Sequence, residues 1–586
     1  MFRKLAMVLG LALLAAALQA TGAGNKPLAP AVQWISPNAV VALELTQPKA
    51  LLDLLLDPKL AETITSLPVY QKQASQPGFK QFLGVIAYLE STLGTDWRTG
   101  VRRLLGGGIT LAILPDDTFL LAVDSEDPQL LQQLHETILG FAKGDAAKEG
   151  DPDRIVSEEY RAVTAWRSGP KEAHAIVENR LLLTNRLDVI KAVLDLRAEP
   201  NSKNLAGLPV YRAAKEAAGA DAAATVFVHL KALTADPAVQ QALSQSPNPM
   251  ATLLLAELPE VVRESSWLAI GLRVEGNRIA FQASVDGKMA DPGGPTSFAL
   301  PSQPDEGVLP NLSVPRRIAG LSFYRDLHKF YGAKDNFFPE RTSGLIFFEN
   351  MMGIFFTGRD LTEEVWGETR PEIRLVVAEQ EYDPSLGTPQ VQIPSFAVIF
   401  RLRQPERFSE VVEEAWQKAV GLVNFTRGQQ AQPGLIIDRP VYGETKLSVA
   451  YFSSAQEEKK TGRESRYNFR PALARLDQYL ILSSTDGLTR DLLDALKKEI
   501  ANPVKPLTDS HTLAEVDVVQ LASILRANRE NLILDNMLKK GNPREQAETE
   551  IDLLTTILNY LGQAKLNFGS QHGRVNAGLE LRLNLP

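Results

Sequence analysis

The two halves of this 586-residue chain carry the same order of strand and helix patterns, and this internal repeat constrains the fold more than any other feature. In the first half, an apolar strand pattern at 118–123 precedes Pro128 and an amphipathic helix pattern that ends at Phe141. In the second half, a strand pattern at 395–400 precedes Pro405 and a similar helix pattern. Proline is favoured in the first helical turn because its φ angle is preset there. The blocks align without a gap and pair Phe119 with Phe396, Pro128 with Pro405, Leu131 with Phe408, and Leu134 with Val411.

Further blocks recur in the same order along the two halves. They are strand–helix blocks that begin at 181 and 480, strands at 224–228 and 514–518, and closing hairpins at 267–285 and 565–583. Strands joined by short turns indicate antiparallel pairing, and alternation of apolar and polar residues indicates a sheet with one covered face. We therefore predict an α+β fold with two diverged copies of a layered domain, in which helices pack on largely antiparallel sheets. Whether the two sheets are separate or continuous is left open.

A Pro/Gly-rich segment at 286–310 separates the two halves. Proline removes backbone donors and glycine adds chain entropy, so this segment is predicted to be a linker. The predicted organisation is a signal peptide at 1–24, a first α+β domain at 31–285, the linker at 286–310, and a second α+β domain at 311–586. Two charged, glycine-containing segments at 143–153 and 456–466 are predicted to be solvated loops.

The first 24 residues have the pattern of a secretory signal peptide. Arg3 and Lys4 precede an apolar run from Leu5 to Leu18, and small residues follow it. This run is shorter than the roughly 20 residues that span a bilayer. We therefore expect an exported bacterial protein, periplasmic or extracellular, with no transmembrane segment after cleavage. Retention of the segment as an uncleaved anchor is the alternative.

The composition excludes several classes of site and partner. The chain has no cysteine, which excludes disulfides, thiolate nucleophiles and Cys-ligated metal sites. Its formal net charge is −8 and it contains no basic tract, so we expect no nucleic-acid partner. An exported protein without disulfides must be held together by burial of its cores.

None of the metal or nucleophile motifs is complete. The six histidines lack a second ligand at the spacing that places two on one helix face or strand, and Leu139 stands where His135-Glu136 would need the second histidine of a zinc-protease motif. Ser168-Gly169-Pro170-Lys171 has the Ser-x-x-Lys spacing of penicillin-binding enzymes, but Gly-Pro between two strand patterns predicts a hairpin turn. Gly106-Gly107-Gly108 is interpreted as a helix end that enters a strand. We therefore assign no catalytic, cofactor-binding or metal-binding residue, and expect no cofactor.

Aromatic residues concentrate in the second half and provide the best candidate for an interaction surface with lipid, peptide or protein. The alternative is that they line a core, as the apolar helix pattern around Phe79 would in the first half. The candidate surface residues are Phe337, Phe338, Phe347, Phe348, Phe355 and Phe356.

Several weak motifs accompany the repeat: Trp97 followed by Gly106-Gly107-Gly108, and Leu-Pro-Val-Tyr segments at 67–70 and 208–211. With the signal peptide and the duplicated strand–helix units, the chain resembles an exported bacterial protein family of unknown function. The resemblance implies no activity and no functional residues.

The predicted function is non-catalytic binding or scaffolding in the cell envelope, with an unknown envelope protein or a lipid as partner. One alternative is a hydrolase-type enzyme whose site is assembled from distant Asp, Glu and His residues. Another is a lipid-associated periplasmic protein that uses the aromatic-rich region.

Overall fold

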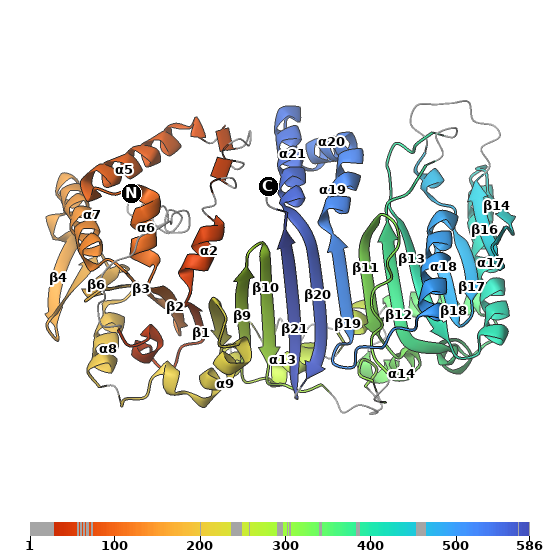
Figure 1. Cartoon of the computed structure of the whole chain (residues 1–586), viewed down its shortest axis with the longest axis horizontal. Helices are drawn as coiled ribbons and strands as arrows, with labels where there is room; N and C mark the ends of the chain where they lie inside the picture. Colours follow the sequence, from red (N-terminus) through yellow and green to blue (C-terminus); the bar gives the residue numbers. More distant parts are fainter. Residues whose placement is uncertain are drawn as a thin grey trace. The chain divides into compact units, whose positions relative to one another are not determined.

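The computed structural model describes residues 28–584 with a set of short gaps (Figure 1). The gaps are 56–57, 59–60, 63–64, 66–69, 72–73, 200, 236–238, 240–248, 257, 290–296, 302, 304–305, 339–342, 383–386, 453–463 and 572. The predicted signal peptide at 1–24 and most of the Leu-Pro-Val-Tyr segment at 67–70 lie outside the described residues. Within the described part of the chain, no helix combines the length and the apolar character needed to cross a bilayer.

The described residues form two compact units. The first contains the chain up to Leu243 together with Val262–Gly287, and the second contains Ser244–Val261 together with Lys288–Asn584. The second unit therefore includes α12 (Pro249–Leu255), which precedes the last strands of the first unit in the sequence.

The described residues of the predicted linker at 286–310 form no helix or strand of their own. Phe298, Val308 and Leu309 are nevertheless buried, and Val308 pairs with Leu507 in an isolated β-bridge. These residues therefore pack within the second unit.

The sheet of the first unit is antiparallel throughout its described pairings. In spatial order its strands are β10 (Arg278–Val285), β9 (Leu268–Glu275), β8 (Ala224–Val228), β1 (Val41–Leu45), β2 (Gly108–Leu114), β3 (Thr118–Asp124), β7 (Arg180–Thr184), β6 (Ala173–Val177), β5 (Val163–Ser168) and β4 (Ile155–Tyr160).

Helices cover both faces of this sheet (Figure 1). One face carries α2 (Pro48–Leu55), α5 (Pro77–Leu93), α6 (Trp97–Leu105) and α7 (Pro128–Lys148), and the other carries η1 (Ala31–Trp34), α8 (Leu187–Ala198), η3 (Leu205–Gly207) and α9 (Pro209–Ala218). Successive side chains of a strand point to opposite faces. In β3, Leu120 therefore packs in one core with Ile190 of α8, while Val123 packs in another with Leu105 of α6.

The sheet of the second unit is also antiparallel in its described pairings. In spatial order its strands are β21 (Arg574–Leu583), β20 (Leu561–Gln571), β19 (Thr512–Asp517), β11 (Arg317–Tyr324), β12 (Thr369–Ala378), β13 (Ser395–Leu402), β18 (Tyr479–Ser483), β17 (Ala472–Leu476), β16 (Thr445–Phe452) and β14 (Leu435–Asp438), and the short β15 (Val441–Tyr442) also pairs with β16.

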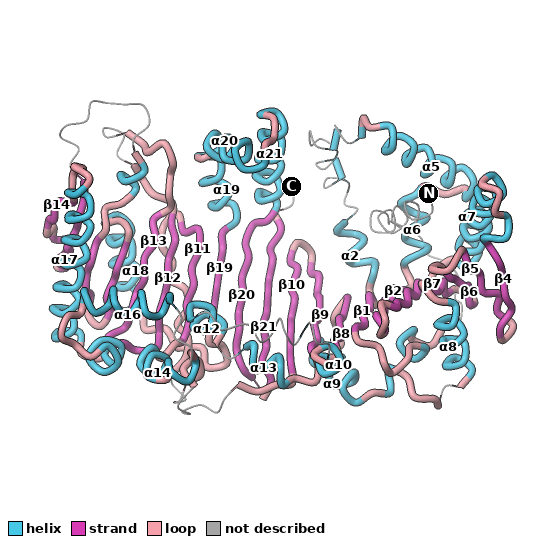
Figure 2. Tube along the Cα trace, turned by 180° about the vertical axis from the view of Figure 1, so that it is seen from behind, coloured by secondary structure: helices cyan, strands magenta, loops and turns pink. Residues whose placement is uncertain are grey.

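The second sheet likewise has helices on both faces. α18 (Asp486–Ala501) covers the face that is in front in Figure 1, and α16 (Ser343–Phe355) and α17 (Pro405–Gln429) cover the face that is in front in Figure 2. The short η4 (Leu361–Val365) and η5 (Trp366–Glu368) pack in the same core as α17. The other described helical segments are η2 (Pro152–Arg154), α10 (Leu230–Leu233), α13 (Leu258–Glu264), α14 (Leu327–Gly332), α15 (Lys334–Phe337), η6 (Ser465–Asn468), α19 (Val518–Ala527), α20 (Arg529–Lys540) and α21 (Arg544–Tyr560).

The α+β prediction is confirmed, because each unit packs helices against an antiparallel sheet. The strand order is also the same in both units when β1 is matched with β11, β3 with β13 and β7 with β18. In each sheet, the strand that opens the first aligned block pairs with the strand that opens the second: β3 with β7, and β13 with β18.

The helix that follows β3 begins as the sequence predicts but extends further. Pro128 is in its first turn, and the Asp127 side chain accepts a hydrogen bond from the Leu130 N–H. The sequence pattern placed the end of this helix at Phe141 and a loop at 143–153. Both boundaries are wrong, because α7 continues to Lys148. The reason is that Ala142 and Ala146 are both buried, so the packed face of the helix persists through the charged segment.

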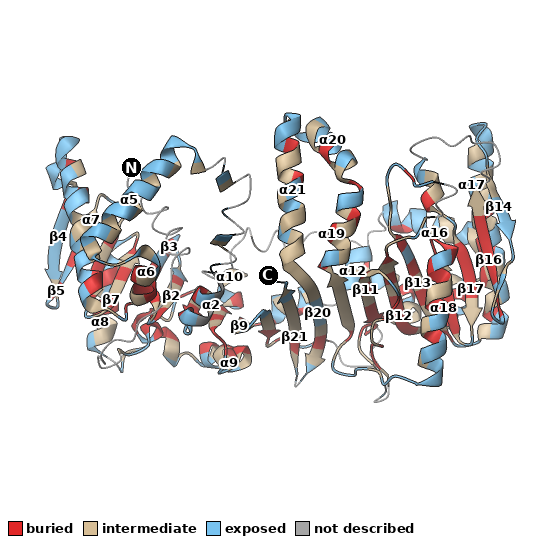
Figure 3. Ribbon diagram, turned by 45° about the horizontal axis from the view of Figure 1, so that its top comes forward, coloured by how far each residue is buried: buried red, intermediate tan, exposed pale blue. Residues whose placement is uncertain are grey.

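Exposure differs strongly among these helices (Figure 3). None of the residues of α5 is buried, although the helix is rich in apolar side chains. In α16 the only buried residue is Leu345, while Phe347 is 67% exposed. These two helices therefore contribute little to the cores.

Candidate functional site

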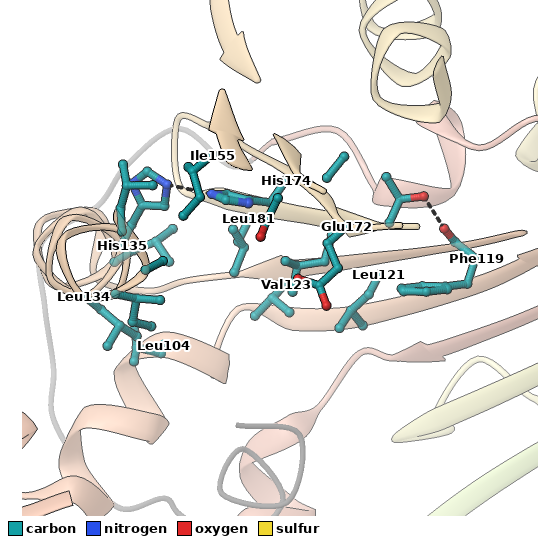
Figure 4. Close-up of a pocket in the computed structure, with 18 of the residues that line it drawn as sticks. Leu104, Phe119, Leu121, Val123, Leu134, His135, Ile155, Glu172, His174 and Leu181 are labelled. Carbon is teal, nitrogen blue, oxygen red and sulfur yellow. Dashed lines mark hydrogen bonds between the residues drawn. The ribbon is translucent and has the colours of Figure 1, made fainter. Parts of the chain in front are cut away.

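A pocket of about 430 Å³ lies in the first unit between α7 and the sheet (Figure 4). It extends from α7 across β3 and β7 to β6 and the turn that precedes β6. Apart from two histidines, its polar lining residues are Ser168, Lys171, Glu172 and Thr184, and every other lining residue is apolar.

The periodicity of two elements builds the walls of this pocket. On α7, Leu131, Leu134 and Ile138 recur at intervals of three and four residues and so lie on one face of the helix. On β3, Phe119 and Leu121 alternate with residues that point to the opposite face of the sheet. Phe119 is 36% exposed, so the pocket reaches the surface beside this ring.

Two histidines form a pair in this apolar lining. His135 lies on α7 and His174 on β6, and their Nε2 atoms are 3.0 Å apart, as the dashed line in Figure 4 shows. Burial lowers the pKa of His174 to about 4, with a further contribution from the neighbouring His135. Burial likewise lowers the pKa of His135. Both rings are therefore neutral at pH 7, and one of them donates an N–H to the other.

The turn between β5 and β6 forms part of the pocket rim. β5 ends at Ser168, β6 begins at Ala173, and Gly169 has a φ of 64°, which confirms the predicted hairpin turn. The turn places Ser168 and Lys171 at the pocket, where no motif had assigned them a role.

The glycine triplet at 106–108 has the structural role that the sequence predicts. α6 ends at Leu105 and β2 begins at Gly108, so the triplet joins a helix to a strand. A side chain at Gly107 would place its Cβ 2.7 Å from the Asp124 carbonyl oxygen. Glycine is needed here because the backbone of β3 approaches too closely for any other residue.

The second unit has a smaller pocket of about 260 Å³ at the corresponding place, between α16, α17, β13 and β18. The alignment that pairs Leu134 with Val411 also pairs Leu139 with Trp416. Trp416 lines this second pocket and is buried. A larger side chain therefore fills part of the volume that remains open in the first unit.

The histidine pair has no counterpart in the second unit. The same alignment pairs His135 with Val412. In the strand register, Ala173 faces Thr184 and Ala472 faces Ser483, so His174 corresponds to Leu473. Val412 and Leu473 pack together in an apolar core. The fold therefore does not require the two histidines.

The six phenylalanines proposed from the sequence as an interaction surface lie in three places. Phe337 and Phe338 pack in an aromatic cluster with Phe298 and Phe330. Phe355 and Phe356 line the second pocket, and Phe348 stacks on Trp366 with ring centroids 6.3 Å apart, while Phe347 is 67% exposed. The structure thus places Phe337 and Phe338 in one aromatic cluster, Phe348, Phe355 and Phe356 at or beside the second pocket, and Phe347 at the surface.

Sequence reasoning missed the pocket in the first unit because its residues come from separate segments. His135 was interpreted as part of an ordinary helix, and nothing in the sequence placed it beside His174. One signal was present: within the aligned repeat, His135 stands where the second half has Val412. In the described ranges, no three His, Asp or Glu side chains are grouped as a metal ion would require.

A family model for proteins of unknown function, DUF3352, matches residues 6–314. The chain belongs to this family. The resemblance to a family of unknown function is thereby confirmed, and the matched region contains every residue that lines the pocket beneath α7. No curated protein matches the chain.

Among solved structures, three crystal forms of TP0453 are similar to parts of this chain. Crystal form III has 11% identity and a TM-score of 0.25, covering 46% of this chain and 85% of the other. Form I has 13% identity and a TM-score of 0.24, covering 46% and 81%, and form IV has 11% and 0.24, covering 43% and 79%. TM-scores this low carry no information about the function of the chain.

Proposed function

We propose that this protein is a non-catalytic binding protein of the cell envelope that holds an apolar ligand in the pocket beneath α7. The observation that carries the proposal is the pocket itself, with its volume of about 430 Å³ and its largely apolar lining. Ligand sites in proteins typically enclose roughly 300–1,000 Å³ and combine apolar walls with a few polar groups.

A hydrocarbon chain is the ligand class that suits these walls. Leucine and isoleucine side chains from α7 face Leu121 and Val123 of β3 and Leu181 of β7 across the pocket. Burial of apolar surface stabilises a complex by roughly 25 cal/mol per Å², so such a ligand binds without any charged partner. The signal-peptide pattern at 1–24 supports a location in the envelope, where lipids supply hydrocarbon chains.

The polar groups of the pocket support binding more than catalysis. The lining of this pocket includes Ser168, Glu172 and His174. These residue types also occur in the active sites of hydrolases. His174 is hydrogen-bonded to His135, and none of the described hydrogen bonds joins Ser168 to either ring. A serine nucleophile requires such a bond to its general base.

The two units are, in our proposal, diverged copies of one ancestral domain. The identical strand order and the equivalent positions of the two pockets support this. The first copy keeps an open pocket, and the second has become narrower through Trp416. The first unit is therefore the main binding unit.

The proposal is tested by titrating the full-length protein with Nile red, an uncharged apolar dye whose fluorescence rises when it is buried. Wild-type protein is expected to bind one dye molecule with high affinity. The variant Leu139→Trp introduces the residue that occupies the equivalent position of the second unit, and it is expected to weaken dye binding at least about tenfold.

Val423→Trp is the matched control, because Val423 is 41% exposed on α17 and lies outside both pockets. It adds the same side chain and should leave the affinity unchanged. Absence of dye binding by the wild type, or equal binding by Leu139→Trp, would contradict the proposal.

A further inference from the structure

The polar side chains of the pocket determine which class of ligand the pocket selects. His135 and His174 lie in an otherwise apolar wall, and their Nε2 atoms are 3.0 Å apart. We propose that this pair binds the carboxyl group of a single long-chain carboxylic acid, an inference that rests on the proposed function of the pocket.

Recognition of a ligand explains why the histidines are present at all. At the same positions, the second unit has Val412 and Leu473, which pack in an apolar core. The fold is thus compatible with two aliphatic residues there. Two imidazoles in place of these aliphatic side chains remove polar ring nitrogens from water. This costs free energy unless the nitrogens form hydrogen bonds.

The ring nitrogens of the pair do not all have hydrogen-bond partners among the described residues. One mutual hydrogen bond uses one nitrogen from each ring. The Nδ1 atom of His135 is buried and has no hydrogen-bond partner among the described residues. A buried polar atom without a partner is uncommon, so contacts among the described residues do not fully compensate the burial of the pair.

A carboxylic acid complements a neutral histidine pair. Because neither ring is charged at pH 7, the pair presents one N–H donor and one unprotonated nitrogen acceptor. A carboxyl group has an acceptor C=O and a donor O–H on one carbon, so it can bond to both rings by replacing their mutual bond. An ester has acceptors only and can satisfy one ring, while a hydrocarbon satisfies neither.

The charged groups near the pair favour the neutral acid. Glu136 follows His135 on α7, and Lys171 and Glu172 carry opposite charges at the rim of the pocket. On β5, Trp166 lies beside the His135 ring and has the Lys143 ammonium 4.4 Å above it. None of these groups supplies an unopposed positive charge inside the pocket, so the carboxyl group binds with its proton.

A metal ion suits the pair less well. Zinc sites use at least three protein ligands, and only two ring nitrogens converge here. A ligating histidine also donates its second N–H to an acceptor, which His135 lacks.

The test measures displacement of Nile red by dodecanoic acid and by methyl dodecanoate at pH 6.5. It compares the wild type with the double variant His135→Val/His174→Leu, which carries the residues of the second unit. Loss of the two hydrogen bonds is expected to lower the ratio of acid affinity to ester affinity at least about tenfold. The ester affinity should change less than about threefold, which shows that the pocket is intact.

An unchanged ratio in a variant that still binds the dye and the ester would overturn the carboxyl inference and leave the proposed function standing. Failure of the wild type to bind the dye, the acid and the ester would overturn both. If the double variant does not fold, the single variant His174→Leu is measured in the same way, with the same fall in ratio expected.

Discussion

The Nε2 atoms of His135 and His174 lie 3.0 Å apart, although 39 positions separate the two residues in the sequence. This contact joins the middle of α7 to β6 at one wall of an apolar pocket. Because the equivalent positions of the second unit are aliphatic, the pair distinguishes the pocket of the first unit from its counterpart.

The partly buried His174 makes the free energy of unfolding depend on pH. Its pKa is about 4 in the folded protein and about 6.5 in an unfolded chain, so the unfolded state binds more protons between these values. The free energy of unfolding therefore falls as the pH drops through this window, by about 3 kcal/mol from this residue when the pH reaches 4. Urea unfolding at pH 7.5 and 4.5 measures the difference.

His174→Leu removes this contribution and is expected to reduce the loss of stability between pH 7.5 and 4.5 by about 2 kcal/mol. His328→Gln is the control, because His328 is partly exposed and pairs with the exposed Glu363. If His174→Leu lost as much stability as the wild type over this range, the inference that the pair is neutral in the folded protein would be wrong.

Arg325 is a buried cation whose removal should be costly. It is 1% exposed, burial lowers its pKa to about 9, and it donates to the carbonyl oxygens of Leu253 and Leu254 at the end of α12. Arg325→Met leaves these acceptors unpaired, and we expect the free energy of unfolding to fall by about 3 kcal/mol. Denaturant unfolding monitored by circular dichroism measures this loss.

Arg475→Met is the matched comparison for Arg325. Arg475 pairs with Glu406, whose side chain is 84% exposed, and such surface pairs contribute less than about 1 kcal/mol. Equal losses in the two variants would contradict a structural role for the buried guanidinium.

Trp416 is predicted to keep the second pocket narrow. Trp416→Leu introduces the residue of the first unit and enlarges this cavity, at a cost of about 3 kcal/mol in stability. We expect the number of Nile red molecules bound per chain to rise from one to two, measured by titration at protein concentrations above the dissociation constant. A stoichiometry that stays at one would show that Trp416 does not limit access.

Gly107 tests the interpretation of the glycine triplet. The Cβ of Gly107→Ala would lie 2.7 Å from the Asp124 carbonyl oxygen, so the strand must shift and the variant should lose about 2 kcal/mol. Gly84→Ala on α5 meets nothing within 4 Å and should gain about 1 kcal/mol from helix propensity. Melting temperatures that change in the same direction would contradict the steric explanation.

Local features of the fold could be predicted from the sequence because short-range chemistry determines them. Pro128 marks the start of α7, the turn at 168–172 follows from Gly169-Pro170, and the triplet at 106–108 marks a helix end. The end of α7 could not be predicted, since the charged residues around it gave no sign that Ala146 is buried.

The candidate site required the order of the strands. Strands β3 and β7 pair with each other although about sixty residues separate them in the sequence. This pairing brings together the residues of the two strands that line the pocket. The aromatic residues of the second half show the converse. Their density suggested one surface, whereas Phe338, at the end of α15, is buried and Phe347, within α16, is 67% exposed.

The most direct test of the account is photo-crosslinking of the full-length protein with dodecanoic acid that carries a diazirine on its chain, followed by peptide mass spectrometry. We expect labelled residues to fall within 131–142 of α7 and within β3 or β7, and we expect Leu139→Trp to abolish this labelling. Labelling confined to other segments, or undiminished in Leu139→Trp, would contradict the claim that the pocket beneath α7 binds an apolar ligand.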